Sequence, residues 1–154
     1  MSVATDSQVM KRLGTARDHL DAQEWEQGLP ILQQIIETAG DTLLAVETGR
    51  YWNAADFCHL LISEIPGQGL AVYRDRVDPQ AAEWLKMAEK TLNPALFERV
   101  VRTAFNSSSG DDALWHLGSL AFEQGRYVVA RQHWQLLVAP ARPAPEDAQR
   151  GRPR

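Results

Sequence analysis

The chain of 154 residues is poor in cysteine and has no long apolar run. Its single cysteine, Cys58, cannot form an internal disulfide, so packing alone has to hold the fold. The first residues lack the basic, apolar and cleavage regions of a signal peptide, and no apolar run is long enough to span a bilayer. From these absences we expect no membrane span and, for the chain as written, a cytoplasmic location.

The chain also lacks the positive charge that a nucleic-acid partner would require. Its formal net charge is -4 at pH 7, with 44% hydrophobic and 23% charged residues. A negative surface disfavours both phosphate backbones and anionic membranes. The apolar content is enough for one folded domain with a core of useful size. We therefore expect a globular domain that binds no nucleic acid.

The end of the chain differs from the rest in composition. Residues 140–154 begin with Pro-Ala-Arg-Pro-Ala-Pro and contain further arginines. Such a composition ends regular structure and cannot build a packed core. We expect a helical domain over residues 1–139, followed by a disordered tail rich in proline and arginine over residues 140–154.

What the chain does have is helical periodicity. Apolar residues recur at spacings of three and four positions in eight segments. Asp78-Pro79 and Asn93-Pro94 each place a capping side chain before a proline that has no amide hydrogen, which predicts two helix starts. The connections within successive pairs of segments are short, so each pair should form an antiparallel hairpin. The sequence therefore predicts an all-α fold of about four helical hairpins.

Residues 113–138 have the alternation of small and large side chains that is typical of a tetratricopeptide hairpin. In that repeat, small residues let two antiparallel helices approach closely, a glycine makes the turn, and aromatic rings fill the remaining space. These roles fall on Leu117, Gly118, Gly125, Tyr127, Ala130 and Trp134. Tyr127 also lies 102 residues after Trp25, which equals three periods of about 34 residues. We predict a tetratricopeptide-like α-solenoid.

One stretch, residues 43–53, interrupts the helical pattern. Glu47-Thr48-Gly49-Arg50 lies between two apolar runs and has the composition of a turn. We predict a small β-hairpin near residues 43–53. An isolated hairpin is marginally stable, so we expect Trp52 to pack against the helices.

An ordered set of short motifs carries a family resemblance. It includes Gly49-Arg50-Tyr51, Gly69-Leu70-Ala71-Val72-Tyr73-Arg74, Val77-Asp78-Pro79-Gln80-Ala81 and Gly110-Asp111-Asp112-Ala113-Leu114. In this order the chain, over residues 9–138, resembles the N-terminal helical region of planctomycete envelope proteins. In that family a tetratricopeptide-like region precedes a β-propeller of pyrroloquinoline-quinone-type repeats. The resemblance implies a cell-envelope or periplasmic location for a chain with an export signal. It does not extend to quinone binding, because the residues for it are absent here.

No group of residues in the sequence predicts an enzyme. Cys58 and His59 are adjacent, but successive helical side chains point about 100° apart, which disfavours a shared catalytic dyad. His116 and His133 are equally far from the turn at Gly125, yet a zinc site needs further ligands. We expect no enzymatic activity, no cofactor, no metal and no small-molecule substrate. A metal-binding or catalytic helical domain stays as an alternative of another class.

What remains for function is a protein-binding surface. In tetratricopeptide stacks the first helix of each pair lines a concave groove, which receives an extended peptide or a partner helix. The repeat alignment places Asp112, Trp115, Ser119 and Glu123 of the last pair, and Arg17 of the first pair, on this groove. The alternative is that these are solvated positions beside a missing next repeat. The first hypothesis is thus a protein-interaction scaffold, and the second is a structural subdomain that docks on a β-propeller.

Overall fold

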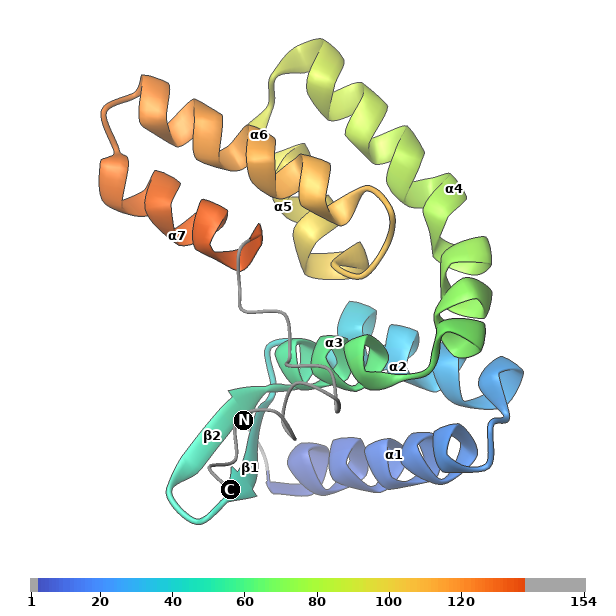
Figure 1. The fold of residues 1–154 in the computed structure, drawn as a ribbon. Helices are drawn as coiled ribbons and strands as arrows, with labels where there is room; N and C mark the ends of the chain where they lie inside the picture. Colours follow the sequence, from blue (N-terminus) through green and yellow to red (C-terminus); the bar gives the residue numbers. More distant parts are fainter. Residues whose placement is uncertain (1–2, 138–154) are drawn as a thin grey trace, which may run out of the picture. The chain divides into compact units, whose positions relative to one another are not determined.

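The computed structural model of the chain describes residues 3–137, apart from the side chains of residues 3–5, 46 and 47. These residues form seven helices and one two-stranded sheet, which confirms the predicted all-α class (Figure 1). The predicted tail over residues 140–154 lies outside the described residues. The chain divides into two compact units, one up to Ala113 and one from Leu114 onward.

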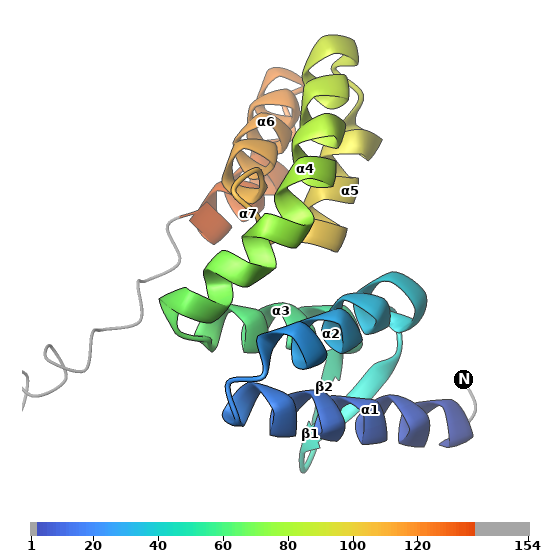
Figure 2. The same ribbon diagram turned by 90° about the vertical axis from the view of Figure 1, so that its right-hand side faces the viewer.

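The elements follow one another in a simple order. They are α1 Val3–Asp21, α2 Trp25–Ala39, β1 Leu43–Glu47, β2 Arg50–Asn53, α3 Ala54–Glu64, α4 Gly67–Thr91, α5 Pro94–Ala104, α6 Gly110–Glu123 and α7 Tyr127–Leu137. In the first unit α2 packs on both α1 and α3, and α4 packs on α5 (Figure 2).

A tight left-handed turn joins α1 to α2. Gln23 has a φ of 61°, and its backbone N–H donates to the Leu20 carbonyl at 3.0 Å. The next N–H, of Glu24, donates to the His19 carbonyl at 2.8 Å. These two bonds are those of a Schellman motif, which satisfies the last carbonyls of a helix and reverses the chain. The turn makes α1 and α2 the predicted first hairpin.

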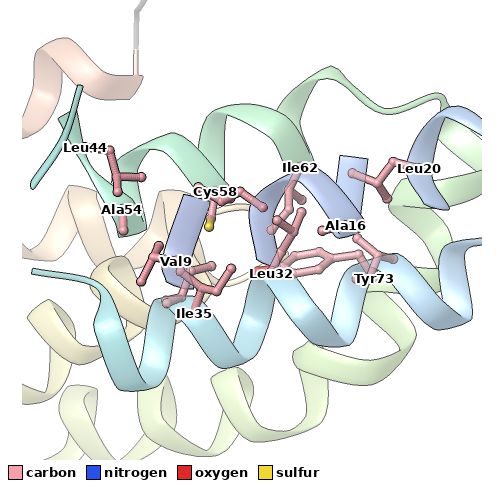
Figure 3. Close-up of a cluster of buried hydrophobic side chains, with 13 residues drawn as sticks. Val9, Ala16, Leu20, Leu32, Ile35, Leu44, Ala54, Cys58, Ile62 and Tyr73 are labelled. Carbon is pink, nitrogen blue, oxygen red and sulfur yellow. The ribbon is translucent and has the colours of Figure 1, made fainter. Parts of the chain in front are cut away.

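The hydrophobic core of the first unit lies where α1, α2 and α3 meet. Leu32 and Ile35 of α2 are 0% exposed, as are Cys58 and Ile62 of α3 (Figure 3). Tyr73 of α4 joins the same cluster and is 1% exposed. Each fully buried aliphatic side chain contributes about 1.5–3 kcal/mol relative to an exposed one. The apolar stripes found in the sequence thus become the interior of this unit.

The predicted β-hairpin is confirmed. β1 and β2 pair antiparallel, with Leu43 opposite Asn53 and Leu44 opposite Trp52. The turn between them contains Gly49 with a φ of 78°, a conformation that glycine adopts without strain. Trp52 lies edge-on to Phe57 of α3, with ring centroids 6.4 Å apart, so the hairpin leans on a helix as expected.

The predicted helix start at Asp78-Pro79 is wrong. α4 runs without a break from Gly67 to Thr91, with Pro79 inside it. The Asp78 carboxylate does not cap its own helix but accepts hydrogen bonds from Ser108, from the backbone N–H at 2.9 Å and from Oγ at 2.7 Å. The apolar segments before and after Pro79, which were predicted as two helices, are therefore one helix. α3 packs on α2 rather than forming a separate hairpin with its own partner.

The other predicted start, at Asn93-Pro94, is confirmed. Asn93 Oδ1 accepts a hydrogen bond from the Ala95 N–H at 3.0 Å, and Pro94 is the first residue of α5. Asp78-Pro79 and Asn93-Pro94 thus have different structures, because only the Asn93 side chain bonds to its own helix.

We predict that Pro79→Ala raises the free energy of unfolding by about 1–3 kcal/mol, because it restores an N–H to the interior of α4 and removes a ring clash. The matched control is Pro94→Ala, at a first helical position, where the change should stay within about 0.5 kcal/mol. Urea unfolding followed by circular dichroism measures both. If Pro79→Ala is neutral or destabilising, α4 does not continue through residue 79.

Candidate functional site

The turn that joins α6 to α7 resembles the turn of the first hairpin. Gly125 has a φ of 75°, and its N–H donates to the Phe122 carbonyl at 3.0 Å. The Arg126 N–H donates to the Ala121 carbonyl at 2.9 Å. The turn is again a Schellman motif, here with the glycine that this motif prefers.

A small residue and a tryptophan fix the contact between α6 and α7. A Cβ atom added at Gly118 would overlap the indole of Trp134. The Trp134 Nε1 also donates to the Trp115 carbonyl, at a distance of 3.4 Å. The close approach predicted for Gly118 and Trp134 is therefore confirmed.

Four rings continue from this contact along the hairpin, and we call them the aromatic ladder: Trp115, Trp134, Phe122 and Tyr127. Trp115 stacks on Trp134 with centroids 5.7 Å apart. Phe122 follows, 5.8 Å from Trp134 and 5.1 Å from Tyr127. Trp115 is 57% exposed, Phe122 51% and Tyr127 62%. Large rings that contact one another but remain this exposed form an apolar patch of the kind that marks interaction sites.

The predicted groove residues lie beside the ladder. Asp112, Ser119 and Glu123 share one stripe of α6, since their spacings of seven and four residues return to the same helical face. Trp115 lies at the edge of this stripe, toward α7, where it stacks on Trp134. The Ser119 hydroxyl donates to the Trp115 carbonyl at 2.9 Å, so it is engaged within α6.

Two features of the site were not expected from the sequence. Phe122 was not among the predicted binding residues, although its position seven residues after Trp115 places it on the same side of α6. Tyr127 was expected to fill the hairpin interior, but more than half of its surface is exposed. Arg17, the remaining predicted groove residue, is exposed on α1 in the first unit. Arg17 and Asp112 thus belong to the first unit, and Trp115, Ser119 and Glu123 to the second.

The turns of the two hairpins match at a spacing of 102 residues. Gln23 corresponds to Gly125, and both adopt positive φ, at 61° and 75°. The hydrogen bonds of the two turns match as well, because Glu24 donates as Arg126 does, to the carbonyl five residues earlier. The two turns thus share one backbone geometry, a common way of ending a helix.

Corresponding positions differ sharply in exposure. Leu13 corresponds to Trp115 but is only 2% exposed, against 57%. Leu20 corresponds to Phe122 and is 9% exposed, against 51%. In the first hairpin, Leu13 and Leu20 belong to the same buried cluster as Cys58 and Ile62 of α3. The face that α3 helps to bury on the first hairpin is exposed on the last one.

The adjacent Cys58 and His59 are not arranged for catalysis. Burial raises the pKa of the Cys58 thiol to about 12, so it stays protonated and is a poor nucleophile. The His59 Nε2–H donates to the Arg102 carbonyl at 2.8 Å. Burial lowers the pKa of His59, and the Arg102 hydrogen bond and the Asp56 charge oppose this effect. Both residues are better explained as parts of the core.

Within residues 3–137, no three histidine, cysteine or acidic side chains come together as a group that could hold a metal ion. A cavity of about 290 Å³ lies between α2, α4 and the end of α5. Leu29, Val77 and Trp84 provide apolar walls, and Arg76 at its rim pairs with Glu26 at 3.2 Å. The cavity gathers no nucleophile with a neighbouring base.

Comparisons with known proteins found no match: no protein family, no curated protein and no solved structure matches the chain. None of the helices in the described part of the chain is both long enough and apolar enough to cross a membrane.

We predict that stability falls when the pH drops below about 6.5, the ordinary pKa of histidine. Because the pKa of His59 is lowered in the folded state, the unfolded chain binds a proton first. The contribution of neutral His59 to the free energy of unfolding is therefore complete above about pH 6.5 and is lost on acidification. His59→Gln should flatten this dependence, whereas His19→Gln, at a histidine of α1 whose side chain is 32% exposed, should retain it. Thermal unfolding between pH 5 and 8 gives the comparison; equal slopes for the two variants would refute the prediction.

We predict that Gly118→Ala lowers the free energy of unfolding by about 1–3 kcal/mol, because its Cβ has no room beside Trp134. Gly14→Ala is the matched control, since nothing lies within 4 Å of a Cβ built there on α1. It should raise stability by up to about 1 kcal/mol through helix propensity. Urea unfolding followed by tryptophan fluorescence measures both, and an equal gain for the two variants would contradict the close contact.

Proposed function

We propose that the chain is a non-enzymatic protein-interaction scaffold of the tetratricopeptide type, which binds a peptide or a partner helix. The observation that carries the proposal is the exposed aromatic ladder on the α6–α7 hairpin. The corresponding face of the first hairpin is buried in the core together with side chains of α3. A partner that supplies a helix to the ladder would complete the packing that the first hairpin already has.

The composition of the ladder supports binding rather than mere exposure. Tryptophan and tyrosine dominate the residues that carry most of the free energy at protein interfaces. Burial of such rings gains about 25 cal/mol for each Å² of apolar surface removed from water. The neighbouring Asp112 and Glu123 are exposed on α6 and provide a charged rim. An apolar centre with a polar rim is the usual anatomy of an interface.

The same face supports a second candidate function. A structural subdomain that docks on a β-propeller would also cover the ladder with another part of the same protein. This second candidate depends on the resemblance to planctomycete envelope proteins and on an envelope location, and both remain predictions. Sequencing the flanking reading frame tests it: propeller repeats downstream favour the docking role, and their absence favours the independent scaffold.

We predict that Trp115→Ala abolishes recovery of the partner in a pull-down with the full chain, because it removes the end of the ladder. Trp52→Ala is the matched control, since Trp52 is also a partly exposed tryptophan but lies on β2 in the first unit. It should leave recovery unchanged. Arg17→Glu tests the predicted groove on α1 in the same experiment. Recovery that is insensitive to Trp115→Ala would exclude the ladder as the binding site.

A further inference from the structure

We propose that the partner at the aromatic ladder is a second copy of this chain, so that two α6–α7 hairpins pack face to face. This inference rests on the proposed function and names the partner of the same site. A pairing of identical patches around a twofold axis is the commonest form of self-association in proteins.

The first hairpin shows what geometry the ladder accepts. Leu32 of α2 lies together with Cys58 and Ile62 of α3 in Figure 3. A helix from outside the first hairpin, α3, therefore covers this face of the hairpin. Trp134 takes the place of Leu32 at the spacing of 102 residues. Because the ladder rings are larger than leucine, they project farther and can meet the same rings of a second hairpin. Aromatic pairs add about 0.5–1.5 kcal/mol to the gain from burial alone.

The charges beside the ladder fit a face-to-face pair of hairpins whose turns lie at the same end. The charged residues of α6 are all acidic and exposed: Asp111, Asp112 and Glu123. α7 contains no acidic residue, and its Arg131 is exposed, with Arg126 just before it. A twofold axis that runs along the length of the hairpin, parallel to α6 and α7, sets the acidic α6 of one copy against the basic α7 of the other. The hairpin is therefore complementary in charge to itself.

The size of the patch indicates how strong the association should be. Aromatic side chains bury roughly 150–250 Å² each, and three of the four ladder rings, Trp115, Phe122 and Tyr127, are more than half exposed. The ladder thus offers on the order of 300–400 Å² for each copy, less than the roughly 800 Å² of a standard interface. An interface of this size is typical of weak, transient association, so we expect a reversible dimer rather than an obligate one.

Sedimentation equilibrium of the full chain between about 1 and 500 µM tests the proposal. The wild type and the Trp52→Ala control should pass from monomer to dimer. Trp115→Ala should weaken dimerisation by at least tenfold, an effect of the size found for interface aromatics. Glu123→Lys and Arg131→Glu should each weaken it by roughly tenfold, and the double variant should recover most of the loss. Recovery in the double variant requires that the two charges face each other across the interface.

The remaining outcomes each decide the question. A wild-type chain that stays monomeric throughout overturns the proposal, and partner recovery that depends on Trp115 would then leave the scaffold function standing. A dimer that Trp115→Ala does not weaken also overturns it, because another surface would carry the contact. A monomer whose Trp115 is nevertheless protected from acrylamide quenching overturns it in favour of a segment of the same chain as the occupant.

Discussion

The close approach of two antiparallel helices at a small residue is the contact on which the structure depends. In the last hairpin, Gly118 leaves room for the Trp134 indole, and in the first, Gly28 lies against Leu20 and the Ala16 carbonyl. In each hairpin a left-handed turn between the two helices brings the second helix back along the first. Because the residues at these crossings are small, the larger side chains lie on the outer faces of each hairpin. In the first hairpin these side chains are buried in the core, and in the α6–α7 hairpin they are exposed.

The sequence predicted the features that depend on local chemistry. The turn at Gly125, the cap at Asn93 and the β-hairpin turn at Gly49 all follow from residue types at fixed offsets. The error at Pro79 has a long-range cause: the Asp78 side chain bonds to Ser108, thirty residues away, and no local pattern indicates such a partner.

In the candidate site, too, the sequence predicted what local pattern determines and missed what tertiary packing determines. The sequence indicated Trp115, because repeat periodicity identifies which face of α6 is polar and which is apolar. It did not indicate that Phe122 and Tyr127 would extend that position into a ladder. Whether an apolar residue is buried depends on what covers it, and Leu20 and Phe122 occupy equivalent positions with opposite exposure. Local pattern therefore predicts the hairpin, and tertiary packing decides which of its faces is available for binding.

The central claim is that a second copy of the chain covers the aromatic ladder, and ¹⁹F NMR of the chain labelled with 5-fluorotryptophan tests it most directly. Trp115→Phe assigns the Trp115 resonance among the five tryptophans. On concentration from micromolar to millimolar, the account predicts that the Trp115 and Trp134 resonances shift while those of Trp25, Trp52 and Trp84 stay fixed. Shifts confined to the tryptophans of the first unit, or no shift at all, would contradict it.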